Sequence, residues 1–154
     1  MKEKDKVILS HLRNNAKESI VNLSKKIGVP ASTIYDRVNV HEKNIIKRYT
    51  ALLNFEKLGF HGRAYFAVKL DDMQKRRELL DFLVNHPNIN SLYKINFGYH
   101  YLFEAIFKNV VEAETFINTL NEKFELDQKH IFSVVEDIKK EDFLTKPEHY
   151  DALI

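Results

Sequence analysis

Polar side chains dominate the stretch from Ser32 to Asn39, and only Ile34 and Val38 interrupt them. The two apolar residues are four positions apart, which places them on one side of a helix and leaves the polar residues outside. Serine, threonine, arginine and asparagine can bind the phosphates or base edges of DNA. The alternative is a solvated helix face without a partner. The polar residues are Ser32, Thr33, Tyr35, Asp36, Arg37 and Asn39.

A helix before this one would hold the polar face in place. Ser19 can accept hydrogen bonds from the free N–H groups of a helix start, and Gly28 can end that helix in the left-handed conformation. Pro30 then begins the next helix, where no backbone donor is needed. Helix, short turn and second helix form the helix-turn-helix pattern, whose second helix enters the major groove of DNA.

Segments on either side of the motif extend this unit. Apolar residues recur at helical spacing from Asp5 to about Lys17, so we expect a first helix that completes a three-helix core. Residues Ile45 to Leu53 are rich in apolar and β-branched types and are predicted to form a strand, the wing of a winged variant. Lys47 and Arg48 in this segment are placed to touch phosphates, which would add affinity that depends on salt.

Charge is divided unevenly along the chain. Residues 1–60 carry 12 Lys and Arg against 6 Asp and Glu, a net charge of +6, whereas residues 61–154 carry 12 against 16, a net charge of −4. A basic segment that contains a helix-turn-helix pattern is typical of a nucleic-acid-binding module. The acidic remainder would be repelled by phosphates, so we expect it to meet protein or a small ligand.

The second part of the chain alternates between strand and helix patterns. Its order is β-α-β-β-α-β, which is the ferredoxin-like arrangement. Both helices cover one face of such a sheet, so a second copy of the chain is the simplest cover for the other face, which is rich in Phe and Tyr. The predicted elements are strand Arg63–Leu70, helix Asp71–Asn85, strands Ile89–Phe97 and Tyr99–Phe107, helix Val110–Phe124 and strand His130–Glu136.

The sequence therefore predicts an α+β protein with an N-terminal winged helix-turn-helix and a ferredoxin-like βαββαβ domain. We place the DNA-binding domain at residues 1–54 and a linker at 55–61. The dimerisation and effector domain follows at 62–140, and residues 141–154 form a C-terminal tail.

Composition excludes several other classes. The chain has no cysteine, so it has no disulfide framework and no thiol nucleophile. No apolar run approaches the roughly 20 residues that cross a bilayer, and the charged N-terminal residues do not resemble a signal peptide, which suits the cytoplasm. The 7 histidines show no zinc-ligand spacing, and the 4 glycines are too dispersed for a phosphate-binding loop. We expect no catalytic residues, no metal and no cofactor.

The order of short motifs resembles the Lrp/AsnC family of bacterial and archaeal regulators, over about residues 5–140. Such a resemblance implies a DNA-binding transcription regulator that dimerises through the second domain and often assembles further, into tetramers or octamers. It also implies a free amino acid as effector in many members. The residues that carry it are Asp5 to Ile8 and Leu12, Leu23 to Val29, Thr33-Ile34, Arg37-Val38, Ile46 to Asn54 and Leu58-Gly59-Phe60.

Three features depart from the family pattern. The segment after Arg37 is one residue shorter, so that His41 or Val40 takes the place of a core leucine. The turn before the third strand normally reads Gly-x-aromatic-Asp. Here it reads Gly98-Tyr99-His100-Tyr101, which we take as the candidate effector site. The C-terminal tail is also longer than the family needs.

Two alternatives use the same architecture. One is an enzyme similar to the siroheme decarboxylases, in which His100 and the tyrosines would line a tetrapyrrole site with Arg63 and Lys94 as the nearest cations. The other is a ligand-sensing scaffold that no longer binds DNA.

Overall fold

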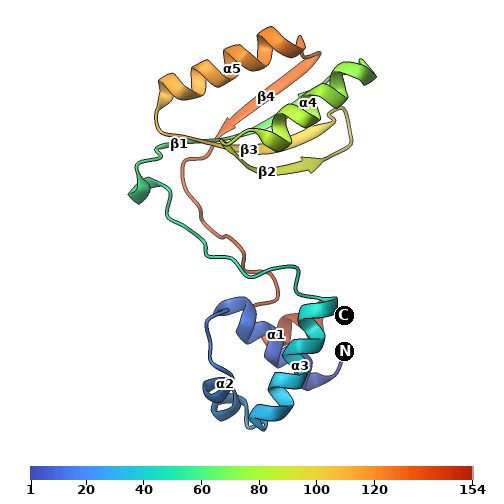
Figure 1. Ribbon diagram of the computed structural model, residues 1–154, viewed down its shortest axis with the longest axis vertical. Helices are drawn as coiled ribbons and strands as arrows, with labels where there is room; N and C mark the ends of the chain where they lie inside the picture. The colour runs from blue at the N-terminus through green and yellow to red at the C-terminus, as the bar shows by residue number, and fades with distance from the viewer. Residues whose placement is uncertain (154) are drawn as a thin grey trace. The chain divides into compact units, whose positions relative to one another are not determined.

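The computed structural model describes residues 1–153 and divides the chain into two compact units (Figure 1). The first unit combines Met1–Leu52 with the segment that begins at Ile138, and the second unit is Leu53–Asp137. The C-terminal segment therefore belongs with the N-terminal helices, although most of the sequence separates them.

The first unit is a three-helix core with the expected motif. Helix α1 is Glu3–Asn14, α2 is Ile20–Ile27 and α3 is Ala31–Asn44. The hydroxyl of Ser19 accepts a 3.1 Å hydrogen bond from the backbone N–H of Asn22, and Gly28 ends α2 with φ of 66°. Both local signals are confirmed. Ile8, Leu23, Val29 and Ile34 form the core, flanked by Leu12, Ile20, Ile27 and Val38.

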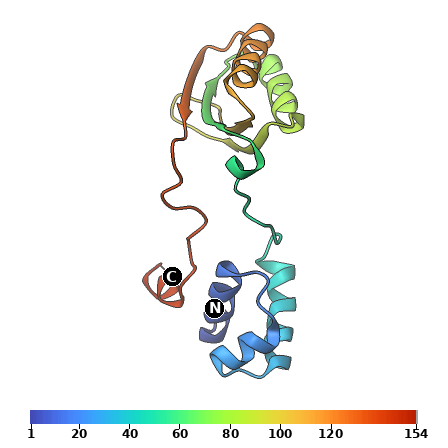
Figure 2. The same ribbon diagram turned by 90° about the vertical axis from the view of Figure 1, so that its left-hand side faces the viewer.

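Helix α6 (Pro147–Leu153) packs beside α1 in the same unit, as both views show (Figures 1 and 2). Tyr150 on α6 is buried, with 5% of its surface exposed. The carbonyl of Phe143 accepts a 3.2 Å hydrogen bond from Nε of Arg13, and the carbonyl of Thr145 accepts one from the side chain of Asn14. The tail thus adds a fourth helix, α6, to the three helices of this unit.

The second unit is a four-stranded antiparallel sheet in the order β2-β3-β1-β4. The order of elements along the chain confirms the βαββαβ prediction. Helices α4 and α5 cover the same face of the sheet (Figures 1 and 2). The elements are the short 3₁₀ helix η1 (Glu56–Leu58), β1 (Gly62–Lys69), α4 (Met73–Asn85), β2 (Ile89–Lys94), β3 (Tyr101–Phe107), α5 (Val110–Phe124) and β4 (Gln128–Ser133).

Aromatic side chains fill the space between sheet and helices. The rings of Phe66 and Phe103 stack with centroids 4.9 Å apart, and Phe116 of α5 meets Phe66 edge-on at 5.6 Å. On the opposite face the alternation of the strands leaves Tyr93 and Phe132 more than half exposed. One face of the sheet is therefore a packed core, and the other carries exposed aromatic rings.

One predicted element is wrong. Residues 45–53 form no strand, so the unit is a helix-turn-helix without the expected wing. Strand propensity alone does not make a strand, because the backbone groups need a neighbouring strand to pair with. Other boundaries differ by a few residues: α1 ends at Asn14 rather than near Lys17, and β4 ends at Ser133 rather than Glu136.

Candidate nucleic-acid interface

The outer side of α3 carries most of the predicted polar face. Ser32, Tyr35 and Asp36 are exposed, and Val40, one turn further on, is 52% exposed. Thr33 and Asn39 are half-buried at the margins. Ile34 is fully buried on the opposite side, as its spacing predicted. Helix α3 therefore anchors itself with its apolar side and presents short polar and aromatic side chains to solvent.

Arg37 does not face outward as expected. Its side chain is 32% exposed, and Nη1 lies 3.4 Å from Oδ2 of Asp5 on α1. The same carboxylate lies 3.2 Å, through Oδ1, from Nε2 of His41. His41 is buried and occupies the core position that the shortened sequence pattern left open, whereas Val40 is exposed. A polar cluster of Asp5, Arg37 and His41 thus joins α1 to α3.

The segment after α3 begins with two backbone bonds, in which the N–H groups of Ile45 and Ile46 donate to the carbonyl of His41 at 2.7 and 2.8 Å. Lys47 and Arg48 follow and are exposed. Tyr49 donates a 3.0 Å hydrogen bond to Glu42, and burial together with this bond raises the pKa of Tyr49 to about 12. The segment therefore leaves α3 along a defined path that places two cations just beyond the helix.

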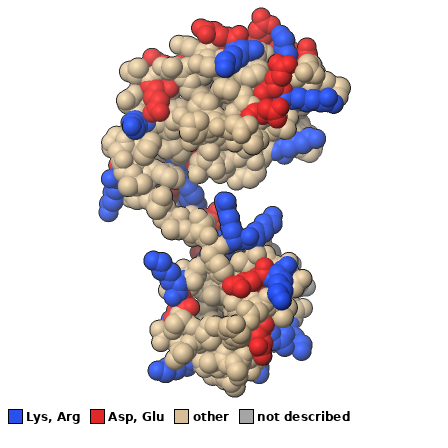
Figure 3. All heavy atoms as spheres, in the orientation of Figure 1, with Lys and Arg blue, Asp and Glu red and all other residues tan. Residues whose placement is uncertain are grey.

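Figure 3 shows one face of the molecule coloured by charge. On the helical unit, lysine and arginine side chains lie around the margin of this face. On the sheet unit, acidic and basic side chains are mixed. Lys25 and Lys26 at the end of α2 are also exposed. The positive charge of the N-terminal part is thus spread over surface side chains, where it is available to a polyanion.

The residues predicted to bind an effector lie in the turn between β2 and β3 and at the start of β3. Gly98 has φ of 94°, which suits the turn. The hydroxyl of Tyr99 lies 2.5 Å from Nδ1 of His130, whereas Nδ1 of His100 accepts a 3.1 Å hydrogen bond from the backbone N–H of Leu70. Tyr101 is buried in the core between sheet and helices. Tyr99 therefore contacts β4, whereas His100 contacts the backbone just after β1.

No family model matches the chain, but curated relatives and solved structures do. The chain is 30% identical over 119 residues to the HTH-type transcriptional regulator FL11 of Pyrococcus horikoshii, covering 77% of this chain and 78% of the relative. It is also 30% identical over 118 residues to the transcriptional regulator AzlB of Bacillus subtilis, covering 75% of each.

Two solved structures share the fold. A transcriptional regulator of Neisseria meningitidis in complex with L-Met superposes with a TM-score of 0.84 at 22% identity, covering 91% of this chain and 93% of that one. AsnC of E. coli gives a TM-score of 0.79 at 19% identity, covering 91% and 95%. The chain belongs to the Lrp/AsnC family. It is a DNA-binding transcriptional regulator, as the sequence predicted.

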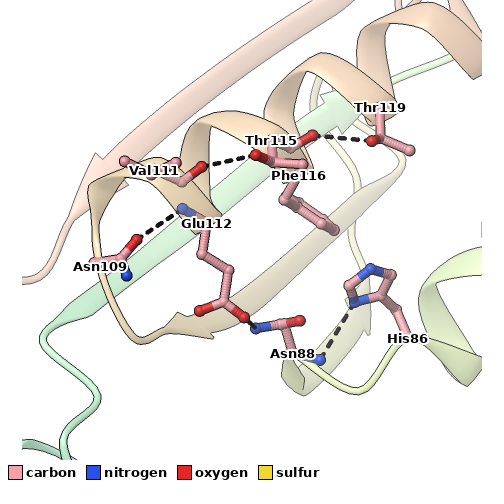
Figure 4. Close-up of a pocket in the computed structure, with 8 residues that line it drawn as sticks. All are labelled: His86, Asn88, Asn109, Val111, Glu112, Thr115, Phe116 and Thr119. Atoms are coloured by element: carbon pink, nitrogen blue, oxygen red, sulfur yellow. Dashed lines mark hydrogen bonds between the residues drawn. The ribbon is translucent and has the colours of Figure 1, made fainter.

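This Lrp/AsnC member has two open hollows in its sheet unit that the sequence analysis missed. The larger, of about 600 Å³, lies beside α5 (Figure 4) and the smaller, of about 480 Å³, lies near the edge of β2. No sequence motif marks either one, because their residues come from separate segments. The larger is lined by His86, Asn88, Asn109, Val111, Glu112, Thr115, Phe116 and Thr119.

The polar groups of the larger hollow bond mainly to one another. Nδ1 of His86 accepts a 3.3 Å hydrogen bond from the N–H of Asn88, whose side chain donates to Glu112 at 3.1 Å (Figure 4). Burial lowers the pKa of His86, and the backbone N–H of Lys108 lowers the pKa of Glu112. The larger hollow therefore contains an imidazole that resists protonation. Both carboxylate oxygens of Glu112 already accept hydrogen bonds, from Asn88 and from the backbone of Lys108.

The cations proposed for a tetrapyrrole site are not gathered around such a site. Arg63 forms ion pairs with Glu104 and, at 2.6 Å, with Asp137. Among residues 1–153, no group of three or more His, Asp or Glu side chains is arranged to hold a metal ion. None of the helices that the structure describes is long and apolar enough to span a membrane.

Proposed function

We propose that this Lrp/AsnC regulator binds its operator as a homodimer, with the outer face of α3 in the major groove and without enzymatic activity. The observation that carries the proposal is the division of α3, with Ile34 and His41 buried and Ser32, Tyr35, Asp36 and Val40 exposed. Such a helix is already anchored by its own unit, so its exposed side is available to DNA. We place the protein in the cytoplasm, where it would meet its operator.

Each side chain on that face suits a particular contact. Asn39 can bind adenine through two hydrogen bonds, and Ser32 and Thr33 can bind phosphate or base edges. Tyr35 and Val40 offer apolar surface to a thymine methyl group. We assign base recognition to these five residues, since Arg37 is engaged with Asp5.

Lys47 and Arg48 are proposed to bind phosphates. Both are exposed and follow directly after α3. Contacts of this kind set the register of the protein on the duplex and supply affinity that falls as salt rises, without choosing a sequence.

The open face of the sheet is the proposed dimer interface. Tyr93 and Phe132 are 53% and 56% exposed there, and large exposed aromatics are typical of protein interfaces. A two-fold dimer would present two copies of α3, so we expect a roughly palindromic operator whose half-sites lie whole helical turns apart. We further propose that dimers assemble into tetramers or octamers.

We propose that an amino acid or a similar small molecule modulates this assembly through the turn that contains Gly98, Tyr99 and His100, with the buried Tyr101 supporting the turn at the start of β3. The related Neisseria regulator was solved with L-Met, which supports an amino-acid effector in this fold. In this chain the turn holds Phe97, 93% exposed and with φ of 59°, beside Gly98. An exposed ring on a fixed turn is suited to contact a ligand or a neighbouring dimer.

Selection of bound duplexes from a random pool, with and without the free amino acids, tests the proposal. We expect enrichment of one palindromic motif and a change in affinity with one amino acid. A protein that binds no duplex at low salt would contradict DNA recognition and favour the ligand-sensing scaffold. A spectral change on adding siroheme would favour the alternative of an enzyme similar to the siroheme decarboxylases.

A further inference from the structure

Asp5 is a buried carboxylate at the junction of α1 and α3. Only 5% of the residue is exposed. Its Oδ1 lies 3.2 Å from Nε2 of His41, and its Oδ2 lies 3.4 Å from Nη1 of Arg37 and 3.3 Å from the backbone N–H of Lys2. Burying a carboxylate costs free energy of folding unless the charge is paired and hydrogen-bonded. These three contacts therefore offset the cost of placing Asp5 in the core.

Both side-chain partners come from one helix. Arg37 and His41 are one turn apart on α3, so a single carboxylate on α1 holds two successive turns of that helix. The two helices also share an apolar cluster, in which Ile8 of α1 and Ile34 of α3 are fully buried. Apolar contacts are not directional, whereas the pairs to Asp5 depend on the rotation of α3 about its axis.

Arg37 stands at the edge of the face that we assign to DNA. At about 100° of rotation per residue, it lies about 60° round the helix from exposed Val40 and about 40° from buried His41. Its long side chain can therefore extend toward solvent or toward the core. The ion pair with Asp5 directs it inward and leaves the side chain 32% exposed.

We propose that Asp5 is a positioning residue that keeps Arg37 away from DNA phosphates and fixes the rotation of α3. This deepens the proposed function and rests on α3 being the helix that faces DNA. Asp5 neutralises a cation next to the reading face, which reduces sequence-independent affinity. Base contacts by Ser32, Tyr35 and Asn39 then supply a larger share of the binding free energy.

The salt dependence of binding to a duplex of unrelated sequence tests this role. Asp5→Asn keeps the size of the side chain and removes the charge that holds Arg37. We expect the slope of log K against log salt to steepen by about 0.9 for each protomer that gains a phosphate contact. Arg37→Gln in the parent should leave the slope unchanged, and the double variant Asp5→Asn/Arg37→Gln should return to the parent slope.

Glu3→Gln is the matched control, because it removes the same charge from the same helix while Lys6 keeps its contact with Asp151. A comparable steepening with Glu3→Gln, or a steepened slope that persists in the double variant, would show a general charge effect and overturn the proposal. A flatter slope for Arg37→Gln would show that Arg37 already touches DNA. The measurement on Arg37→Gln tests the proposal even if the Asp5→Asn variant does not fold. If the unmodified protein bound no duplex at low salt, that result would overturn the proposed function as well.

Discussion

The ammonium of Lys6 on α1 lies 2.6 Å from Oδ1 of Asp151 on α6, joining residues 145 positions apart. Arg13, at the other end of α1, lies 2.5 Å from Glu141 and also donates to the carbonyl of Phe143. The tail therefore follows α1 over most of its length. Exposed ion pairs contribute little to stability, so the buried ring of Tyr150 should be the main anchor.

Tyr150→Ala should destabilise the helical unit by about 2–4 kcal/mol, because it removes a buried aromatic ring and leaves a cavity against α1. Thermal or denaturant unfolding measures the loss. The matched control is Tyr35→Ala, which removes an exposed ring from α3 and should change stability by less than about 0.5 kcal/mol. Equal stability of the two variants would show that the ring of Tyr150 does not anchor the tail.

The sequence predicted those parts of the fold that depend on local signals. Ser19 and Gly28 act within one helical turn, so the limits of α2 could be read from residue types alone. Strand β3 was recognisable because Tyr101, Phe103, Ala105 and Phe107 recur at every second position, and all four lie in the core between sheet and helices.

Long-range pairing was beyond such reasoning. The carboxylate that holds Arg37 is 32 positions away, so spacing on α3 could not show that this arginine turns inward. In the same way, the contact between Tyr99 and His130 on β4 joins residues 31 positions apart, so spacing in the turn could not show it. The segment 45–53 has the residue types of a strand, but the structure offers it no strand to pair with.

Phe132→Asp should convert the dimer into a monomer. The ring is 56% exposed on the open face of the sheet, and a carboxylate buried against a second copy would be unpaired. Sedimentation velocity or light scattering measures the mass. Val84→Asp is the control, since Val84 is 64% exposed but lies on α4, which covers the other face. A Phe132→Asp variant that keeps the parent mass would contradict the proposed interface.

Asn39→Ala and Lys47→Gln should weaken DNA binding in different ways. Loss of Asn39 removes a contact to a base, so affinity for the selected operator should fall by about 1–3 kcal/mol while binding to unrelated duplex stays the same. Loss of Lys47 removes a phosphate contact from each protomer, so both duplexes should bind more weakly and the salt slope should become shallower by about 0.9 for each protomer bound. Fluorescence anisotropy across a salt series separates the two. Identical effects of the two variants on both duplexes would argue against base recognition by Asn39.

His100 should make the sheet unit less stable as the solution becomes acidic. Burial lowers the pKa of His100, with a smaller contribution from Arg76, and Nδ1 must stay unprotonated to accept the N–H of Leu70. The unfolded chain binds its proton near the ordinary value of about 6.5, whereas the folded chain resists it to lower pH. The stabilisation is therefore complete above about pH 6.5 and is lost as pH falls through the folded pKa.

Urea unfolding between neutral and mildly acidic pH measures this loss. His100→Asn can still offer an acceptor near the position of Nδ1 but cannot be protonated, so its unfolding free energy should fall less steeply with acid than that of the parent. His86 contributes in the same direction because burial also lowers its pKa, and the double variant with His86→Asn should be flatter still. A parent and a His100→Asn variant with the same pH slope would show that this histidine does not link protonation to the fold.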